Sequence, residues 1–436
     1  MLQRLALTIA LALSSSHTLH AQQPISLQSV STGFSFPLDF VQDPNDPDVQ
    51  FVVEQGGLIR VLEGGVLSGT NFADLSTEVG NTTGEQGLLG FAIDPANVDT
   101  CYVAYTDASN SVVIARFTRD LLTPLEVAEI TDLTPLLTLG QPFPNNNGGH
   151  IDFGPDGFLY ASLGDGGAPS DIQLRGQDPL TLWATIIRAD VSDTASTSLT
   201  PAPGNPFIGD INGNDLVWHF GVRNPWRFSW DTGPCSTGAM MVADLGQDAM
   251  DEVNAVPGDE GHNFGWSCKE GTMSFGGCLG TPAMTDPVHA YSGVAGQSVT
   301  GGFVYRGVQM PHNRGRFFFG DFITGQIWSF ELVDNGDTTF SASGNTEMLA
   351  TGRNISSFGR DASGELYVLD YINGEVLKVV PNESLGDLNL GGTVDGVDLG
   401  LLLGSWGDTG CAIADLNNDG LVNGADLGIL LGNWSS

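Results

Sequence analysis

The segment from Asn145 to Gly167, NNNGGHIDFGPDGFLYASLGDGG, holds the residues best suited to bind a small ligand. Polar, glycine-rich loops bracket one short strand, so backbone and side chains can approach a ligand closely while the strand holds them in place. The amide of Asn146 could hold a hydroxyl group, but it has no basic lone pair at neutral pH and cannot accept a proton. We interpret Asp165, in the GDGG turn, as a turn residue rather than a ligand.

His150 is the nearest candidate base in this segment, because it lies four residues after Asn146 at the entrance of the strand. A residue four positions along an extended chain lies about 13 Å away, so His150 would have to move to reach a ligand held by Asn146. The favoured interpretation is a surface histidine with ordinary hydrogen bonds.

A small set of arginines is the second feature, because the chain is strongly acidic. It has 15 Lys and Arg against 51 Asp and Glu, a formal net charge of −36. Nucleic acid and anionic membranes are thereby disfavoured as partners, whereas cation sites are favoured. An anionic cofactor would need several arginines focused on one spot, and Arg223, Arg306 and Arg353 lie in three different loops that could offer bidentate charge-assisted bonds. A structural salt bridge is the alternative for each of them, and for Arg306 the two interpretations weigh about equally.

The rest of the chain up to about residue 380 must position these loops. With 59 glycines, 41% apolar and only 15% charged residues among 436, the composition suits a large β-rich domain with tight turns. Two strands joined by a glycine-containing turn recur six times, with the period-two alternation of strands. Six such hairpins predict the blades of a closed propeller, with a β-sandwich as the minor alternative. They begin at Phe51, Cys101, Phe158, Met240, Arg316 and Glu365.

Several segments resemble the glucose/sorbosone dehydrogenase family, soluble six-bladed propellers that use pyrroloquinoline quinone (PQQ) and calcium. The segment Asn145–Gly167 resembles the family's HNGG, FGPDG, LY and GDGG motifs, with Asn146 in place of the catalytic His. The similarity covers about residues 30–380 and includes GEQGLLGFAIDP, GVRNPWRFSWD, DLGQDAMDEVNAVPGDEGHNFGWSCKEG, GGFVYRG and FGRDASGELYVLD. It implies an all-β six-bladed propeller over residues 25–381 and oxidation of a sugar C1 hydroxyl, with hydride transfer to the quinone.

The resemblance also implies roles for individual residues. Asn146 takes the catalytic position and Arg223 polarises the quinone, while the cofactor-binding set is Glu85, Arg223, Asn224, Arg306 and Arg353. Glu85 stands where the family has an amide. A structural calcium is implied at Glu252 and the backbone of Phe264, with Asp244 as a further oxygen donor or a turn carboxylate.

The tail, residues 382–436, contains two copies of one loop 28 residues apart, each followed by an apolar helix. It resembles a dockerin type I repeat with EF-hand-like spacing, in which alternate oxygen ligands wrap calcium. The predicted ligands are Asp387, Asn389, Thr393, Asp395 and Asp398, then Asp415, Asn417, Asp419, Leu421, Asn423 and Asp426. The first copy has Gly391 where the second has Asp419, which predicts weaker calcium binding there. The helix faces would bind a cohesin-like or cell-surface partner.

Residues 1–21 have an Arg, an apolar run and a small residue at Ala21, which predicts a cleaved signal peptide and a secreted, periplasmic or cell-surface protein. No later stretch is apolar enough to span a membrane. Export favours disulfides among the five cysteines, of which Cys268 and Cys278 are the predicted pair.

The favoured function is therefore PQQ-dependent oxidation of a sugar or polyol. The alternative is a catalytically inactive propeller that binds carbohydrate or protein and is attached through its tail. A glycosidase is unsupported, because no pair of acids stands out as acid and nucleophile.

Overall fold

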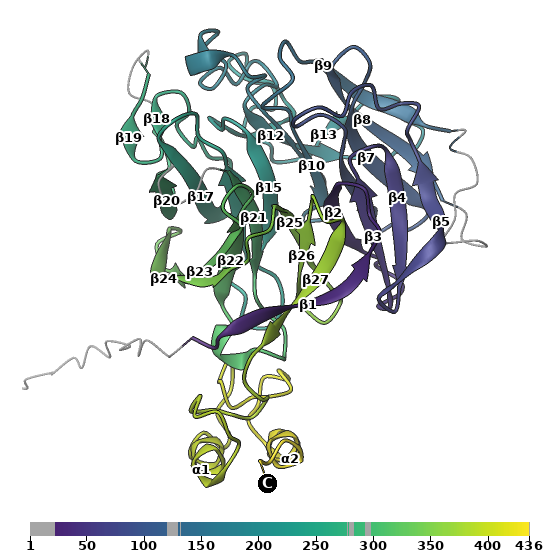
Figure 1. Ribbon diagram of the computed structural model, residues 1–436. Helices are drawn as coiled ribbons and strands as arrows, with labels where there is room; N and C mark the ends of the chain where they lie inside the picture. The colour runs from purple at the N-terminus through teal and green to yellow at the C-terminus, as the bar shows by residue number, and fades with distance from the viewer. Residues whose placement is uncertain are drawn as a thin grey trace, which may run out of the picture.

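The computed structural model describes residues 22–119, 130, 132–276, 278, 283–292 and 298–435. Six antiparallel sheets surround a central axis, and a small helical tail lies at one end (Figure 1). The predicted six-bladed propeller is confirmed, and the β-sandwich is excluded. The predicted signal peptide lies outside the described residues.

Each blade is one sheet, whose strands follow one another from the axis outward. Blade 1 has β2 (Pro37–Gln42), β3 (Val49–Glu54), β4 (Leu58–Glu63) and β5 (Val66–Asp74). Blade 2 has β6 (Leu88–Ile93), β7 (Thr100–Thr106), β8 (Ser111–Thr118) and β9 (Thr134–Gly140). Blade 3 has β10 (Gly148–Phe153), β11 (Leu159–Leu163) and β12 (Thr185–Asp190), and β12 pairs with both β13 (Thr200–Pro201) and β14 (Val217–Phe220). Blade 4 has β15 (Pro225–Trp230), β16 (Ala239–Asp244), β17 (Met250–Pro257) and β20 (His289–Ser292). Blade 5 has β21 (Val299–Val304), β22 (Arg316–Asp321), β23 (Gln326–Asp334) and β24 (Phe340–Ala350). Blade 6 has β25 (Ile355–Arg360), β26 (Leu366–Asp370), β27 (Glu375–Pro381) and β1 (Ile25–Thr32). A small hairpin, β18 (Lys269–Glu270) with β19 (Met273–Ser274), and two 3-10 turns, η1 (Pro169–Asp171) and η2 (Pro311–Asn313), lie outside the blades.

The inner strands form a closed ring, because β2, β6, β10, β15, β21 and β25 each contact the next and β25 contacts β2. They run in the same direction around the axis. Arg227, the third residue of β15, donates to the carbonyl of Leu38, the second residue of β2, and to the hydroxyl of Ser357, the third residue of β25. We name the end where these strands begin the site end and the end where they finish the tail end.

The ring is closed by the first strand of the chain. β1 pairs with β27, with Ile25 opposite Pro381 and Thr32 opposite Glu375, so residues from both ends of the propeller sequence share blade 6. This pairing ties the two ends of the propeller sequence together and so holds the ring closed.

Blade 3 departs from the predicted repeat. The strand that starts near Phe158 does not turn back at once, because residues 164–184 intervene between β11 and β12. The prediction of a hairpin at Phe158–Gly167 is therefore wrong. The GDGG residues have the turn-forming composition of a hairpin, but they open a long loop at the site end.

The turns that precede the second strand of several blades follow the sequence prediction. Asp94 accepts hydrogen bonds from the backbone N–H groups of Ala96 and Asn97, and Asp361 accepts them from Ser363 and Glu365. Local side-chain bonds of this kind fix a turn without tertiary help. The strands that follow are apolar and nearly fully buried between neighbouring blades, as in β3 and β7.

The tail consists of α1 (Gly396–Gly404) and α2 (Gly424–Gly432), each preceded by a polar loop. Its attachment to the propeller includes a covalent link, because Cys235 and Cys411 form a disulfide between the β15–β16 loop and the tail. The predicted disulfide Cys268–Cys278 is also present, and Cys101 is left free and buried. Among the described residues, no helix is long and apolar enough to cross a membrane.

Candidate active site

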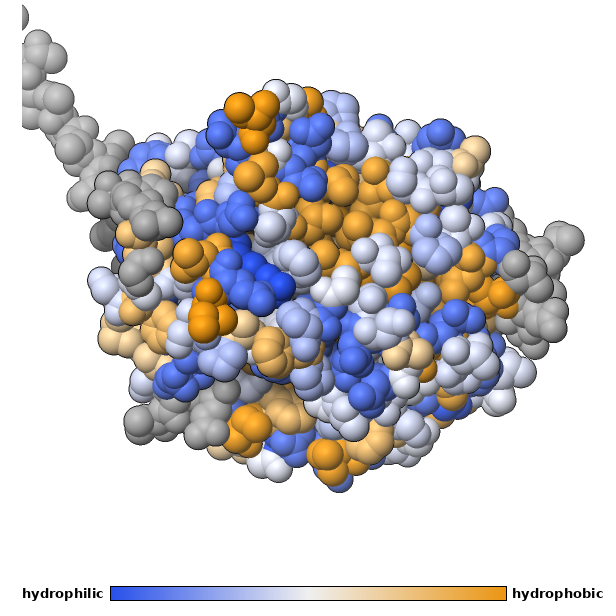
Figure 2. Space-filling view, turned by 90° about the horizontal axis from the view of Figure 1, so that it is seen from above, coloured by the Kyte–Doolittle hydropathy of each residue, from blue (hydrophilic) through white to orange (hydrophobic). Residues whose placement is uncertain are grey.

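Four of the predicted site residues meet at the site end, at the mouth of the central channel. Glu85 precedes β6, Asn146 precedes β10, and Arg223 and Asn224 precede β15. Each lies just before an inner strand, and the inner strands begin side by side, so three blades bring these residues together. Figure 2 views this end, opposite the tail, and shows hydrophilic side chains near its middle beside a hydrophobic area.

Glu85 is the centre of the cluster. Its Oε2 accepts hydrogen bonds from the backbone N–H of Asn146 at 2.6 Å and from the Asn224 amide at 2.9 Å. Surrounding protein raises the pKa of Glu85 above its usual 4.5 because burial disfavours the charge, although the N–H of Asn146, the charge of Arg223 and the Asn224 amide oppose this. The side chain is half-buried, so a ligand at the mouth can reach it.

Asn146 is buried and its backbone is in the left-handed region, with φ of 54°, a conformation that Asn tolerates better than most residues. Its Nδ2 donates to Asp165 Oδ1 at 2.8 Å, and its Oδ1 accepts a bond from Asn145 at 3.3 Å. Both ends of the amide are therefore already bonded to protein. Asn146 positions the loop and, as predicted from its chemistry, offers no base.

Asp165 does more than the predicted turn role. It accepts the backbone N–H of Gly167, as a turn residue would, and also the Asn146 amide and the indole N–H of Trp266 at 3.0 Å. Burial raises its pKa above the usual 3.8. Trp266 was not singled out from the sequence, although it belongs to the GHNFGW turn that was.

Arg223 remains available as a cation. Its Nη1 donates to the carbonyls of Leu245 and Gly246 at 3.1 and 2.7 Å, while its Nε is buried without a hydrogen-bond partner. Arg175 is a second cation here, since its Nη1 donates to the carbonyl of Asp165 at 2.9 Å. Neither guanidinium forms an ion pair with a carboxylate in the described part of the chain. Arg175 was missed in the sequence because no motif marks the long loop of blade 3.

This pair of arginines fits an anionic cofactor, although not as predicted. A tricarboxylate such as PQQ needs cations that protein carboxylates have not already neutralised. Among the described residues, neither Arg223, with its orphaned Nε, nor Arg175 forms a direct ion pair, although the charge of Arg223 also acts on Glu85 and Asp244.

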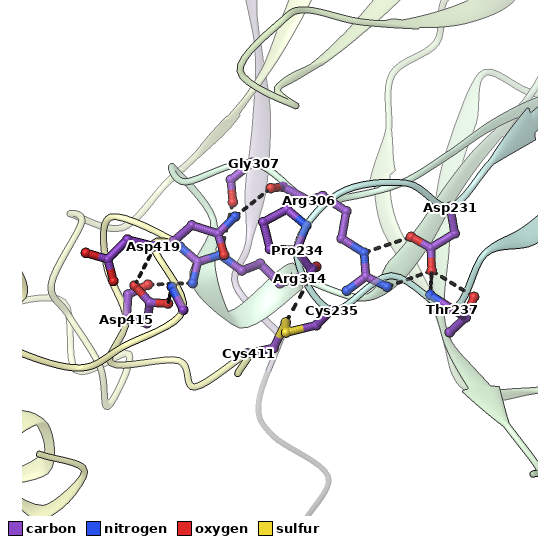
Figure 3. The surroundings of a disulfide bond; sticks show 12 residues. Asp231, Pro234, Cys235, Thr237, Arg306, Gly307, Arg314, Cys411, Asp415 and Asp419 are labelled. Atoms are coloured by element: carbon purple, nitrogen blue, oxygen red, sulfur yellow. Dashed lines mark hydrogen bonds and ion pairs between the residues drawn. A yellow bond between two sulfur atoms is a disulfide. The ribbon is translucent and has the colours of Figure 1, made fainter. Parts of the chain in front are cut away.

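Arg306 does not lie at the site end, and the prediction that it shares one pocket with Arg223 is wrong. It follows β21, whereas Arg223 precedes β15, so the two residues lie at opposite ends of inner strands that run in the same direction. Its Nε and Nη2 donate to Asp231 at 2.8 and 2.7 Å (Figure 3). The tail's Asn418 donates to its carbonyl. Of the two interpretations open for Arg306, the structural salt bridge is therefore the correct one.

Arg353 lies at the site end but is already neutralised. It precedes β25, and its Nη1 bonds to Asp370 and Glu375 at 2.6 and 2.5 Å. These bonds fix the turn between β26 and β27 on the outer side of the inner strand. The structure therefore does not bring Arg353 to Glu85 and Arg223.

His150 is buried inside the ring, not at the surface as expected. Its Nε2 lies 3.1 Å from the carbonyl of Phe228, which makes Nε2 the protonated nitrogen, and its Nδ1 lies 3.9 Å from Asp39. Burial, and then the charge of Arg227, hold its pKa well below the usual 6.5. His150 is therefore a neutral structural residue, and it does not reach the mouth.

Asp244 and Glu252 lie opposite each other in blade 4, next to the cluster. Asp244 accepts the N–H groups of Arg223 and Asn224, and Glu252 accepts those of Gly271 and the Asn254 amide. Burial and the partner carboxylate raise the pKa of Asp244, and burial raises the pKa of Glu252 to about 7.

A cavity of about 10 Å³, room for roughly one water or ion, lies between these acids, Arg223 and Glu270. Glu270 Oε2 is buried there without a hydrogen-bond partner. Phe264 packs in the apolar core between blades 3 and 4. The described residues contain no three His, Cys, Asp or Glu side chains arranged to hold a metal ion. Hard oxygen donors and unsatisfied charge therefore suit a cation at this cavity, but the ligands do not converge as they stand.

The two tail loops have matching hydrogen bonds. Asp387 accepts the N–H groups of residues 391 and 392, and Asp415 those of residues 419 and 420. Asp398 and Asp426 each accept three N–H groups within their own loops, and each forms a capping box with Asp395 or Asn423 at the start of its helix. The other predicted ligands are Asn389, Thr393, Asn417, Asp419 and Leu421. The repeat predicted from the sequence is real in structure, while its calcium binding stays a prediction.

Comparison with known proteins agrees with the fold and the motifs. The family described as Glucose / Sorbosone dehydrogenase matches residues 34–378. Over 283 residues the chain is 32% identical to the HIPL1 protein of Arabidopsis thaliana, covering 56% of this chain and 40% of that protein. It is 24% identical over 319 residues to the aldose sugar dehydrogenase YliI of Escherichia coli, covering 68% of this chain and 78% of the relative.

Solved structures have the same fold at low identity. The PQQ-bound aldose sugar dehydrogenase of Streptomyces coelicolor has a TM-score of 0.65 at 22% identity, covering 84% of this chain and 99% of that one. The apo aldose sugar dehydrogenase of E. coli has a TM-score of 0.65 at 22% identity, covering 82% and 100%. The chain spans about 40% of the plant relatives HIPL1 and HIPL2.

Proposed function

Because the chain belongs to the glucose/sorbosone dehydrogenase family, we propose that it is a PQQ-dependent sugar oxidoreductase in which Glu85 accepts the substrate proton. The observation that carries the proposal is Glu85 itself. It is a mostly buried but not fully enclosed carboxylate at the mouth, bonded to the backbone of Asn146 and the side chain of Asn224, with a pKa that burial raises. A carboxylate with a raised pKa and a route to the ligand is suited to general-base catalysis.

In this proposal each residue of the cluster has one task. Glu85 takes the proton of the sugar C1 hydroxyl, and Asn224 and the N–H of Asn146 hold its carboxylate in place. Arg223 and Arg175 bind the carboxylates of the cofactor. When bound, PQQ supplies the acceptor for the hydride that leaves the sugar carbon. Asn146 stands at the sequence position of the family's catalytic His, but its amide cannot accept a proton.

The test is dye reduction by the purified chain reconstituted with PQQ and calcium, with glucose and other aldoses as substrates. We expect the rate to rise with pH as the Glu85 carboxyl loses its proton, over a range above pH 4.5. Glu85→Gln should lower the rate by about 10²- to 10⁴-fold and remove that pH limb, because the proton acceptor is lost. Glu63→Gln, an exposed acid at the end of β4 and away from the cluster, is the control. A Glu85→Gln variant as fast as wild type would refute the role of Glu85.

A second candidate is a binding protein without catalysis, favoured by the fact that both ends of the Asn146 amide are occupied by protein. Asn146→His separates the two candidates. Turnover by the wild type supports the oxidoreductase. Turnover by Asn146→His alone supports a binding propeller whose cluster is intact but lacks its base.

We also propose that calcium binds at two places, the cavity beside Asp244, Glu252 and Glu270 and the two tail loops. The protein would be secreted, and the tail would attach the propeller to a cohesin-like or cell-surface partner. Oxygen donors in the order of an EF-hand and the matched loops support this for the tail. Terbium luminescence with Asp426→Asn as the altered chain and Asp286→Asn as the control tests it. Binding of terbium that Asp426→Asn leaves unchanged would contradict the assignment of the second loop.

A further inference from the structure

Three aromatic side chains from three blades form a cluster at the site end. Phe36 precedes β2, Phe322 follows β22, and Tyr371 lies between β26 and β27. The ring centroids of Phe36 and Tyr371 lie 4.8 Å apart, and those of Phe322 and Tyr371 lie 5.4 Å apart. These three rings are named the aromatic platform.

Phe36 is held in a position that folding alone does not favour. Its side chain is 48% exposed, and its φ of 53° lies in the left-handed region that large side chains rarely adopt. Residues with such a strained backbone cluster at binding sites and ligand clamps. An exposed ring held in this conformation is a candidate contact for a ligand.

The platform is joined to the candidate active site by hydrogen bonds through one side chain. Tyr371 Oη donates to Gln55 Oε1, and Gln55 Nε2 donates to the carbonyls of Gly84 and Gln86 at 2.9 and 2.7 Å. Gly84 and Gln86 flank Glu85. The backbone N–H of Gln55 also donates to the carbonyl of Phe36. The platform therefore lies next to the loop that carries Glu85, in a fixed position.

The turn beneath the platform explains the position of Arg353. Its bonds to Asp370 and Glu375 fix the ends of β26 and β27, between which Tyr371 lies. The N–H of Tyr371 donates to the carbonyl of Asn354, and the Asn354 amide donates to the carbonyl of Phe322. Two rings of the platform are thus held through the two residues that precede β25.

The chemistry of this surface suits a sugar ring. The apolar C–H face of a pyranose packs on an aromatic ring, and its hydroxyl groups bond to neighbouring amides and phenols. Phe36 and Tyr371 provide the rings, while the Tyr371 hydroxyl oxygen, whose proton is donated to the buried Gln55, can still accept a hydrogen bond at their edge. One sugar at Glu85 and Asn146 would leave the platform uncovered.

We propose that the aromatic platform binds the second and following rings of an oligosaccharide whose terminal ring lies at Glu85, so that the substrate is an oligosaccharide rather than a free monosaccharide. The identity of the terminal-ring site rests on the proposed function. Binding to the platform does not require the quinone, so it can be measured separately from turnover.

The experiment is isothermal titration of the full chain, without quinone, with glucose, cellotriose and maltotriose. We expect at least one trisaccharide to bind about tenfold more tightly than glucose. Phe36→Asn, whose side chain suits the left-handed backbone, should remove most of that preference without lowering the melting temperature. Phe36→Trp should keep it. Trp406→Ala, which removes an exposed aromatic ring from the tail, is the matched control and should change neither affinity.

Equal affinity of the wild type for glucose and both trisaccharides, or no saccharide binding at all, would overturn the platform. A preference that survives in Phe36→Asn would overturn it as well. Trisaccharide binding that depends on Phe36, together with no turnover after reconstitution, would leave the platform standing and refute the oxidoreductase.

Discussion

The two ends of the propeller use arginine for opposite purposes. At the site end Arg223 donates to two main-chain carbonyls, whereas at the tail end Arg306 donates twice to the buried carboxylate of Asp231. Neutral carbonyls orient a guanidinium and leave its charge for a ligand, but a buried carboxylate neutralises it. The group that a guanidinium binds, rather than the motif that contains it, therefore decides whether its charge is neutralised within the protein.

The tail explains why the second end is structural. Arg314, which follows η2, donates to the carbonyl of Asp415 at 2.6 Å, and His312 lies 3.3 Å from the carbonyl of Asp387, so one turn of blade 5 contacts the first residue of both tail loops. The disulfide of Cys411 joins the tail to the next loop of that end (Figure 3). The tail thus covers the end where β15 and β21 finish, and the opposite end stays open to a ligand.

The largest expected difference between the ends concerns the two arginines. Arg306→Gln leaves Asp231 as an unpaired buried charge and should lower the free energy of unfolding by roughly 3–5 kcal/mol. Arg223→Gln loses only bonds to carbonyls, about 1 kcal/mol, but should weaken binding of PQQ in an absorbance titration. Urea unfolding and the titration measure both.

The double variant Arg306→Gln with Asp231→Asn is the control for this pair. It removes both charges and should recover most of the lost stability, since no unpaired charge stays buried. Weaker PQQ binding by a folded Arg306→Gln variant, with Arg223→Gln unaffected, would reverse the assignment of the two ends.

The next effect is the disulfide at the tail end. Cys411→Ser opens a link between residues 176 positions apart and should destabilise the chain by roughly 2–4 kcal/mol. Cys278→Ser opens a link of only 10 positions and should cost less, because a shorter loop restricts the unfolded chain less. Thermal unfolding of both variants is the measurement. Equal melting temperatures for the two variants would show that the link to the tail does not stabilise the propeller more than the short link does.

The third effect is a pH dependence of stability at the site end, which is small per pH unit but accumulates between pH 4.5 and 7. The pKa of Glu252 is raised to about 7 from 4.5, so the folded chain holds a proton there that the unfolded chain releases. Stability present below pH 4.5 is therefore lost as pH rises toward 7, by about 1.4 kcal/mol per pH unit, and Asp244 adds to the same direction.

Calcium should flatten that slope if it binds the cavity, because a cation replaces the proton. Glu252→Gln should remove the share of Glu252 in both the slope and the effect of calcium, and the exposed Glu63→Gln should alter neither. Urea unfolding between pH 4.5 and 7, with and without calcium, decides this. A slope in wild type that calcium leaves unchanged would argue against a cation at this cavity.

Much of the fold could be predicted from the sequence because its signals are local. Strand alternation, Asx turns such as that of Asp361 and the 28-residue repeat of the tail depend on residues close in the chain. The hairpin predicted at Phe158 was wrong because GDGG has the composition of a turn whether it closes a hairpin or opens a long loop. The packing of residues 164–184 at the site end decides for the long loop.

Part of the site was also predicted from the sequence, because the signals of its motifs are local. The loops with Glu85, Asn146, Arg223 and Asn224 were predicted from motifs, and closure of the ring brought them together. Trp266 lies in the GHNFGW turn and Arg175 in a loop without a motif. Neither was predicted, because each is defined by its bond to Asp165, which lies 101 residues from Trp266 and 10 from Arg175.

The sequence by itself determined six blades, a duplicated acidic tail, the pair Cys268–Cys278 and an amide rather than a base at Asn146, because each follows from residue type or short-range spacing. Only the tertiary structure decided which end each arginine occupies, that Cys235 joins Cys411, and that Glu85 takes the central place in the cluster. These depend on the direction of the inner strands and on what each buried charge finds beside it, and in a closed ring those neighbours come from other blades.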